Sequence, residues 1–325
     1  MIDRLQIYES DGFDPYRNLA IEQHLLESVL GGCCLLYLWQ NERTVVIGRN
    51  QNAWAECRTA LLSEDGGHLA RRLSGGGAVY HDLQNLNFTF LMQSEDYDLA
   101  RQLSVIQRAC ALCGIETEVS GRNDLLAQGR KFSGNAFYHH EGRSYHHGTL
   151  LVDTDGEAMK RYLSPSKAKL QAKGVESVRA RVVNLKELDP SITVETLKAA
   201  MKSAFSEVYG LPVSAPPVLD ETCIDELTKH YASDAWLFGQ KLSFTFRCEQ
   251  RFPWGGVELQ FKVDRGVITD AKVYTDAMDD RLASKLESAL IGSRLQKESV
   301  KTALQKPCIG QEQQEDLLDL IADVL

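Results

Sequence analysis

The sequence predicts a mixed α+β protein. We expect a large domain with a central, mostly antiparallel β-sheet and flanking helices, followed by a small α/β domain. Tight turns at Gln128-Gly129 and Glu141-Gly142 join β-prone runs into hairpins. Apolar residues recur at helical spacing between such runs. Because 325 residues suffice for two hydrophobic cores, we expect domains at residues 1–244 and 245–325.

The predicted elements follow one another along the chain. A strand at 7–10 precedes a helix at 18–30, which stops at Gly31-Gly32. The later elements are strands at 35–39, 44–48 and 88–92, an amphipathic helix at 98–113, hairpins at 125–137 and 138–147, helices at 194–209 and 220–231, a β-meander near 257–274, and helices near 279–291, 299–304 and 315–325. The hairpins and the meander make the predicted sheets mostly antiparallel.

Composition and charge exclude several classes of function. The content of 43% hydrophobic and 25% charged residues is ordinary for a globular enzyme. The net charge of −9 argues against a nucleic-acid partner. Because no apolar run approaches the length of a membrane span and the N-terminal stretch lacks the features of a signal peptide, we expect a cytoplasmic protein without a membrane partner.

The cysteines and histidines do not indicate a metal site. Eight scattered cysteines predict reduced thiols, and Cys110 and Cys113 read as buried helix residues, so no zinc is expected. The second hairpin carries histidines at 139, 140, 146 and 147, which we interpret as hairpin residues and not as metal ligands.

The stretch LARRLSGGGAVYHD, residues 69–82, predicts an anion-binding loop. Gly75, Gly76 and Gly77 permit positive φ and close approach of a ligand to backbone N–H groups. Arg71 and Arg72 can present a cationic fork to a phosphate or carboxylate. A Walker loop would end in Gly-Lys-Ser/Thr, and a dinucleotide fingerprint would open a helix. Here strands flank the glycines.

Three further features carry interpretations that the spacing alone leaves open. In LLAQGRKFSGNAF, strand alternation puts Lys131, Ser133 and Asn135 on one face and Phe132 and Ala136 on the other, and the lysine reads as a solvated side chain. Trp39 reads as a core residue or as the wall of an apolar pocket, whereas Gly48 and Asn52 read as packing and turn residues. Residues 164–183 carry five cations against one acidic residue, either as a solvated face or as a contact patch for an anionic ligand or partner.

RRLSGGGAVYHD resembles the signature of lipoate–protein ligases, within the wider biotin/lipoate ligase fold. The resemblance extends to FDPYRNLAIE, WQNERTVVIGRNQNAWAEC, GRND, RKFSGNA, HHGTLL and KGVESVRARVVNL. It covers nearly the whole chain, with a sparser match in the C-terminal third. The fold it implies is the large ligase domain with a small C-terminal domain, as in bacterial members of the family.

The resemblance implies an ATP-dependent ligase that works in two half-reactions. Lipoate and MgATP first give lipoyl-AMP and pyrophosphate. A lysine of a lipoyl domain then attacks the mixed anhydride and releases AMP. The implied acceptors are the E2 subunits of 2-oxoacid dehydrogenases and the glycine cleavage H protein, and lipoate is a substrate and not a bound prosthetic group.

The resemblance also implies a set of site residues. Lys131 is the catalytic residue and reaches both the lipoyl carboxyl group and the α-phosphate, and Asp124 is placed to hold Mg²⁺ bound to phosphates. The ATP and adenylate set is Lys131, Arg72, Ser74, Gly77, Ala78, Val79, Tyr80, His81, Leu19, Glu22, Lys173 and Arg181. The lipoate set is Lys131, Arg72, Gly75, Gly76, Trp39 and His147. Ser74 is expected to act as a hydrogen-bond donor and not as a nucleophile.

Other functions stay open at this point. A lipoyltransferase would use preformed lipoyl-AMP. An octanoyl transferase of the same fold needs a cysteine downstream of the lysine motif, yet none occurs between Cys113 and Cys223. A biotin ligase would carry an arginine-rich loop that is absent here, and a catalytically silent lipoate binder would not need Lys131. We also expect the C-terminal domain to act as a lid over the site.

Overall fold

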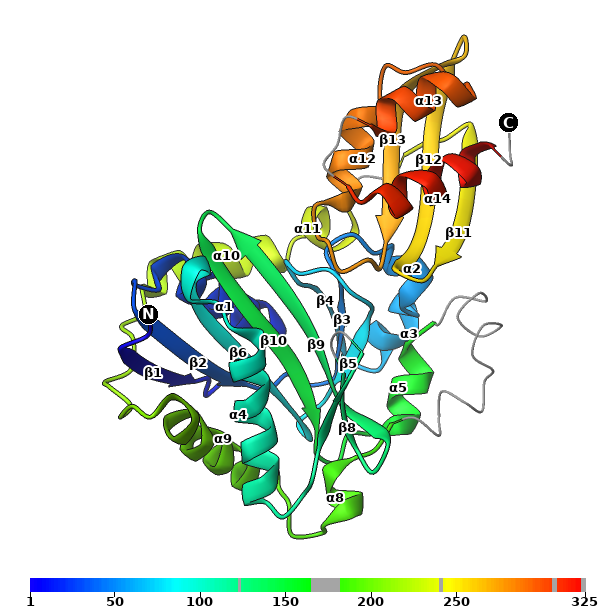
Figure 1. Ribbon diagram of the computed structural model, residues 1–325. Coiled ribbons are helices and arrows are strands. Elements are labelled where there is room, and N and C mark those ends of the chain that lie inside the picture. Colours follow the sequence, from blue (N-terminus) through cyan, green and yellow to red (C-terminus); the bar gives the residue numbers. More distant parts are fainter. Residues whose placement is uncertain (122–123, 165–181, 240–241, 306–308, 323–325) are drawn as a thin grey trace.

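The computed structural model describes residues 1–121, 124–164, 182–239, 242–305 and 309–322 (Figure 1). The strands are β1 (Arg4–Glu9), β2 (Cys33–Trp39), β3 (Thr44–Ile47), β4 (His68–Arg71), β5 (Val79–His81), β6 (Asn85–Gln93), β7 (Glu118–Ser120), β8 (Asp124–Ala127), β9 (Arg130–His140), β10 (Arg143–Leu151), β11 (Phe246–Phe252), β12 (Gly255–Asp264) and β13 (Val267–Thr275). The helices are α1 (Pro15–Ser28), α2 (Ala53–Glu56), α3 (Thr59–Glu64), η1 (Ser94–Asp96), α4 (Leu99–Leu112), α5 (Gly156–Tyr162), α8 (Leu185–Leu188), α9 (Val194–Tyr209), α10 (Glu221–Tyr231), α11 (Asp234–Phe238), α12 (Leu282–Leu290), α13 (Lys297–Leu304) and α14 (Gln311–Ala322).

A seven-stranded sheet with the order β1-β2-β6-β10-β9-β8-β7 forms the centre of the large domain. Only the β1–β2 pair within it is parallel, so the predicted mostly antiparallel sheet is confirmed. Both predicted hairpin turns are present, with positive φ at Gln128, Gly129, Glu141 and Gly142. This conformation matches the right-handed twist of the flanking strands.

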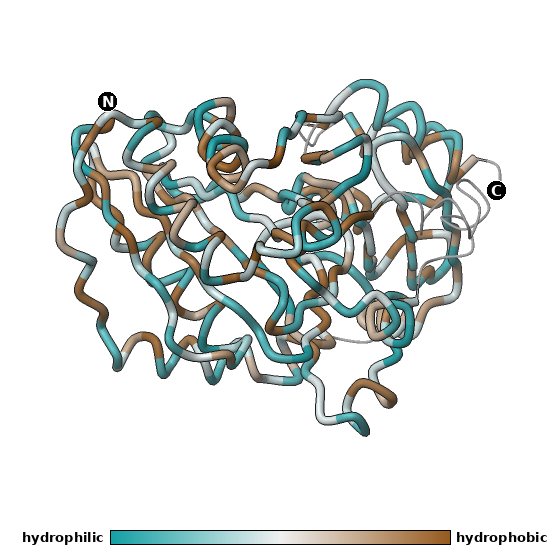
Figure 2. The backbone as a smooth tube through the Cα atoms, turned by 90° about the horizontal axis from the view of Figure 1, so that it is seen from below, coloured by the Kyte–Doolittle hydropathy of each residue, from teal (hydrophilic) through white to brown (hydrophobic). Residues whose placement is uncertain are grey.

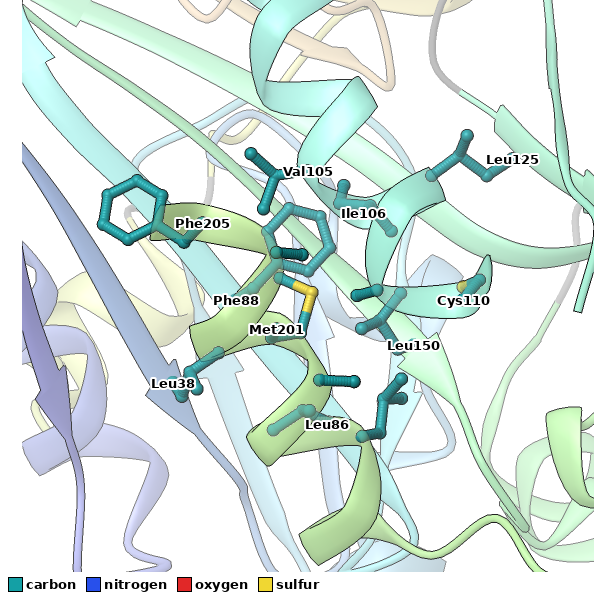
Figure 3. Close-up of a cluster of buried hydrophobic side chains, with 14 of the residues drawn as sticks. Leu38, Leu86, Phe88, Val105, Ile106, Cys110, Leu125, Leu150, Met201 and Phe205 are labelled. Carbon is teal, nitrogen blue, oxygen red and sulfur yellow. The ribbon is translucent and has the colours of Figure 1, made fainter. Parts of the chain in front are cut away.

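One face of this sheet is covered by α4 and α9 (Figure 1). In β6, Leu86, Phe88 and Phe90 point to this face because side chains alternate along a strand. They pack with α4 and α9 into a largely apolar core, which Figure 3 shows around Phe88 and Met201. The other residues of β6, among them Asn87 and Thr89, point to the opposite face. That face therefore carries polar groups although the strand is buried.

The opposite face is covered by α1 and by the small sheet β4-β3-β5. Helix α1 starts at Pro15, with the Asp14 carboxylate accepting from the Tyr16 N–H as N-cap. The glycine loop connects β4 with β5, as predicted, and contacts the large sheet, where Ser74 Oγ lies 2.8 Å from His147 Nε2 of β10. The site therefore lies between two sheets.

The C-terminal part has its own sheet, the meander β11-β12-β13, and its own core with helices α12, α13 and α14. The predicted α+β class with a small C-terminal α/β unit is confirmed. The segment after β13 lies against the glycine loop, where the Gly76 N–H donates to the Ala277 carbonyl at 3.1 Å.

Within the described ranges, none of the helices combines the length and the apolar composition that a membrane crossing requires. Figure 2 shows hydrophobic residues in short segments that are separated by hydrophilic ones. The basic stretch of residues 164–183 lies largely outside the described residues, and so do Lys173 and Arg181.

Candidate active site

A cavity of about 360 Å³ lies between the large sheet, the glycine loop and the segment after β13. Its floor is a row of residues that crosses five neighbouring strands. Trp39 of β2 pairs with Asn87 of β6, and Asn87 pairs with Thr149 of β10. Gly134 of β9 lies next to Thr149 and pairs with Asp124 of β8. The row spans a long slot, from an apolar end at Trp39 to a charged end at Asp124.

Lys131 marks the charged end of the cavity. Its Nζ lies 2.6 Å from Asp124 Oδ1, and both side chains are about one-third exposed. The lysine stem passes over Gly134, where an added Cβ would lie 3.1 Å from Nζ. The Lys131 carbonyl accepts from the Val183 N–H. The part of β9 around Lys131 is therefore also held by a residue that does not belong to the sheet.

The predicted alternation in β9 is wrong for Ser133 and Ala136, whereas Lys131 and Asn135 both line the cavity and Phe132 lies in the core. Leu126 pairs with Lys131 and Leu125 pairs with Ser133, so Phe132 is an extra residue in β9. This irregularity of the ladder is a β-bulge, and it shifts the phase of the strand by one residue. Phe132 enters the core, and Gly134, Asn135 and Ala136 line the cavity with Lys131, whereas Ser133 does not.

Arg72 holds the glycine loop from the inside. Its Nη2 donates to the carbonyls of Gly75 and Gly77 at 2.7 and 2.8 Å, its Nη1 to Val46 and its Nε to Ser74 Oγ. Burial lowers the pKa of Arg72 to about 10, so the side chain stays cationic at neutral pH. It thus places a fixed positive charge in the cavity wall.

Arg71 has a different place from its neighbour. Its donors go to backbone carbonyls, among them those of Gln51 and Leu237. Arg71 is not among the described residues that line the cavity. The expectation that both arginines present a cationic fork to the ligand is wrong for Arg71, because neighbouring residues of a strand point to opposite sides.

A chain of hydrogen bonds runs behind the cavity from Glu22 to Ser74. Glu22 Oε1 accepts from His147 Nδ1 at 2.8 Å and from Thr89 Oγ1 at 2.7 Å. His147 Nε2 lies 2.8 Å from Ser74 Oγ, which also accepts from Arg72. Ser74 is fully buried and does not line the cavity. Its oxygen is thus held between Arg72 and His147 and is not exposed to the cavity.

His81 and Trp39 occupy the apolar end. The Trp39 and His81 rings meet edge to face, with centroids 6.1 Å apart. Burial, with help from the Arg72 charge, lowers the pKa of His81 to about 3, so this imidazole is neutral. Leu19 and Val46 complete the apolar walls.

The structure brings most of the predicted site residues together. Those that line the cavity are Leu19, Trp39, Arg72, Gly76, Gly77, Ala78, Val79, His81, Asp124, Lys131 and His147. Glu22 and Ser74 lie behind it, Gly75 packs on Ala277 and Met278, and Tyr80 packs on Tyr162 in a separate core.

The predicted site sets lack several lining residues: Val46, Gly134, Asn135, Ala136, Gly148 and two further groups. Asn87 and Thr149 belong to buried strands. A polar residue within such an apolar run is the sequence feature that could have identified them as site residues. Arg251, Asp276 and Met278 come from the C-terminal part, where no local pattern marks them.

The histidines of the second hairpin and Cys110 lie in different parts of the large domain. His146 and His147 are adjacent in β10 and point to opposite faces, His146 to Gln102 and Asn135. Cys110 lies in the core of Figure 3. In the part of the chain that the structure describes, no group of three or more His, Cys, Asp or Glu residues could hold a metal ion.

Comparison with known proteins identifies two family models in the chain. Residues 14–206 match the lipoyl protein ligase A/B catalytic domain, and residues 241–321 match the bacterial lipoate protein ligase C-terminus. A lipoate-protein ligase A of Bdellovibrio bacteriovorus is 41% identical over 312 residues, which are 93% of this chain and 92% of the relative.

Solved structures resemble this one over most of its length. P. falciparum LipL1 in complex with lipoate is 27% identical with a TM-score of 0.86, over 98% of this chain and 99% of the other. A lipoate-protein ligase A bound with ATP is 26% identical with a TM-score of 0.64, over 74% and 99%. A bipartite lipoate protein ligase of Thermoplasma acidophilum, described with its E2 lipoyl domain, is 26% identical with a TM-score of 0.66, over 76% and 100%.

Proposed function

The chain belongs to the family of lipoate–protein ligases, and from this premise we propose that it attaches lipoate to a lysine of lipoyl domains at the expense of ATP. The observation that carries the proposal is the single slot with an apolar end at Trp39 and a cationic end at Lys131. Lipoate has a matching shape, an apolar tail with one carboxylate. Such a ligand needs apolar walls and a few well-placed polar groups.

In the first half-reaction, a carboxylate oxygen of lipoate attacks the α-phosphorus of ATP and pyrophosphate leaves. Negative charge grows on the α-phosphate oxygens in the transition state. Lys131 and the fixed charge of Arg72 lie on the cavity wall, where they stabilise that charge without reorganisation. In the second half-reaction, an acceptor amine attacks the lipoyl carbonyl and AMP leaves. This step chiefly needs orientation of the amine.

Mg²⁺ in nucleotide sites usually takes one or two carboxylates together with substrate phosphates. Asp124 and Asp276 are the acidic side chains that line the cavity among the described residues. Asp124 fits the predicted role because it lies next to Lys131, the side chain that is proposed to contact the phosphates. The ion, when bound with ATP, neutralises phosphate charge. Mg²⁺ is thus part of the proposal.

The domain assignment is part of the proposal as well. Residues 1–244 form the catalytic domain, and residues 245–325 form an accessory domain that covers the glycine loop. The contact between Gly76 and Ala277 and the lining side chain of Met278 support this assignment. The proposed acceptors are lipoyl domains of E2 subunits and the H protein, and the predicted location is the cytoplasm.

A thioester mechanism is disfavoured by the positions of the cysteines. Seven cysteines fall in the described ranges, and none of them lines the cavity. Burial raises the pKa of the Cys110 and Cys248 thiols to about 12, which disfavours the nucleophilic thiolate. An octanoyl transferase would need such a thiolate at the site.

The test is the complete reaction, followed by the intact mass of a lipoyl domain incubated with the enzyme, lipoate and MgATP. We expect one lipoyl group on one lysine, and no modification when ATP is omitted. Modification from added lipoyl-AMP, but none from lipoate with MgATP, would reduce the enzyme to a lipoyltransferase. Modification without any nucleotide would contradict the adenylate chemistry.

A further inference from the structure

The C-terminal part contributes one arginine, Arg251, to the wall of the active-site cavity. Arg251 lies near the end of β11 and pairs in the ladder with Gly256 of β12. Asp276 directly follows β13, at the end of the meander that is nearest to the large domain (Figure 1). Arg251 is thus a cation that a second sheet adds to the cavity.

Asp276 fixes the position of this arginine. Arg251 Nη1 lies 3.1 Å from Asp276 Oδ2, and the carboxylate also accepts from the Gly256 N–H at 2.7 Å. The arginine side chain crosses Gly256, where an added Cβ would lie 3.2 Å from Nη1. The backbone therefore holds the carboxylate, and the carboxylate holds the guanidinium group.

Arg251 keeps hydrogen-bond donors for a ligand. A guanidinium group carries N–H groups on three nitrogens, and Nη1 is the one that has a partner among the described residues. Arg72 differs, because its three nitrogens already donate to Ser74 and to backbone carbonyls. The lysines and arginines that line the cavity, within the described ranges, are Lys131, Arg72 and Arg251. Arg251 is therefore the arginine of the cavity that can bind an anion with most of its donors.

The neighbours of Arg251 place it beside the glycine loop. Asp276 precedes Ala277, whose carbonyl accepts from the Gly76 N–H at 3.1 Å. The glycine loop is the part of the site that is predicted to bind an anion, and a planar guanidinium fork matches the oxygens of a phosphate. In the proposed reaction, Lys131 contacts the lipoate carboxylate and the α-phosphate. The two outer phosphates of ATP therefore remain for Arg251.

We propose that Arg251 binds the β- and γ-phosphates of ATP and stabilises pyrophosphate as it leaves. This inference rests on the proposed function and adds a catalytic residue to its first half-reaction. When the carboxylate oxygen bonds to the α-phosphorus, the bond from this phosphorus to the bridging oxygen breaks, and pyrophosphate takes the electron pair. A guanidinium group that Asp276 holds in place stabilises the growing charge without reorganisation.

The test measures pyrophosphate release from lipoate and MgATP with the full-length enzyme. Arg251→Gln should lower kcat/KM for ATP by about 10- to 150-fold, the range expected for a hydrogen bond to a charged group. Arg251→Lys keeps the charge without the fork and should recover part of this loss. Equal kcat/KM for ATP in the native enzyme and in Arg251→Gln would overturn the inference.

Arg247→Gln is the matched control. Arg247 belongs to the same strand and forms ion pairs with Glu249 and Glu258, and it is not among the described residues that line the cavity. The control should keep the native kcat/KM for ATP. A loss in this control as large as in Arg251→Gln would overturn the inference, because it would assign the effect to the strand.

Inhibition by the two products separates a contact with the leaving group from a structural role. Arg251→Gln should raise the inhibition constant of pyrophosphate by about 10- to 150-fold and leave that of AMP unchanged. Transfer from added lipoyl-AMP should keep its native rate, which shows that the variant is folded. An equal increase of both inhibition constants, or an equal loss of transfer, would overturn the inference. Arg251→Lys permits the same comparison if the glutamine variant does not fold.

Calorimetric titration of pyrophosphate into the enzyme, without lipoate or ATP, separates this inference from the proposed function. The native enzyme should bind pyrophosphate, and Arg251→Gln should bind it about 10- to 150-fold more weakly. This result in an enzyme that releases no pyrophosphate from ATP would contradict the ligase function and support the phosphate site at Arg251. Normal pyrophosphate release, with equal affinities of the two proteins for pyrophosphate, would contradict the role of Arg251 alone.

Discussion

Lys131 Nζ and Asp124 Oδ1 lie 2.6 Å apart, and this ion pair closes one end of the cavity between the two sheets. Both side chains are about one-third exposed, so water screens the pair and its contribution to stability is small, about 0–1 kcal/mol. Anionic substrates can therefore replace Asp124 as the partner of the lysine at little cost. The ion pair therefore orients the Lys131 side chain in the cavity and adds little to the stability of the fold.

Lys131→Ala should lose both half-reactions while the protein stays folded. The lost contact to the transition state should cost about 2–4 kcal/mol, or a decrease in kcat/KM of about 30-fold to 900-fold. The melting temperature should stay close to that of the native protein. Adenylation and transfer from lipoyl-AMP would be measured separately. Turnover near the native value in both would remove Lys131 from the mechanism.

Gly48→Ala should displace the glycine loop. An added Cβ at Gly48 would lie 2.3 Å from the Gly76 carbonyl oxygen, which is backbone and cannot rotate away. Overpacking of this kind costs about 1–3 kcal/mol, and we expect lower stability and weaker adenylation. Gly12→Ala is the matched control, because no atom lies within 4 Å of its added Cβ. Equal activities of the two variants would contradict the tight packing of the loop.

Ser74→Ala should retain measurable activity. The variant loses the buried hydrogen bonds of Ser74 Oγ with His147 Nε2 and with Arg72 Nε. Because Arg72 Nε keeps the Gly75 carbonyl as an acceptor, the cost is about 1–3 kcal/mol for the histidine left unpaired. Removal of a catalytic serine nucleophile typically costs about 10⁶ in kcat. The rate of pyrophosphate release discriminates between the two cases. A loss near the larger value would mean that Ser74 forms a covalent intermediate.

Stability should fall as the pH decreases from 6.5 toward 3. Burial lowers the pKa of both His81 and His146 to about 3, whereas the unfolded value is about 6.5. Below pH 6.5 the unfolded chain binds protons that the native protein does not, so protonation favours unfolding. Between pH 7.5 and 5.5 each histidine should lower the free energy of unfolding by about 1.4 kcal/mol.

Urea unfolding at the two pH values measures this effect. The His146→Leu variant should lose about half of the pH dependence that the two histidines produce, whatever its absolute stability. His140 is an exposed histidine of the same hairpin, and His140→Leu controls for a leucine substitution in this hairpin. An equal pH dependence in the native protein and the His146 variant would show that His146 titrates normally.

The fold could be predicted from local signals, because each signal has a local physical cause. The helix Val194–Tyr209 was predicted with its observed bounds, since Thr193 and Gly210 act as caps at its two ends. Both hairpins follow from turn dipeptides that permit positive φ. The order of strands in the sheet depends on long-range pairing, which such local signals do not encode.

The site could be predicted only in part. The glycine loop and Lys131 carry recognisable motifs, and the structure brings them to one cavity. The β-bulge at Phe132 could not be foreseen, because no residue type marks it, and it inverts the facing of Ser133. Arg251 and Met278 reach the cavity through contacts between the two parts of the chain, which a linear pattern cannot show.

The central claim is that this chain itself makes the acyl-adenylate. Exchange of labelled pyrophosphate into ATP, with lipoate and Mg²⁺ present and without an acceptor protein, tests it most directly. We predict exchange that depends on lipoate, is absent with biotin and is lost in Lys131→Ala. No exchange with lipoate or octanoate, together with efficient transfer from supplied lipoyl-AMP, would contradict the claim.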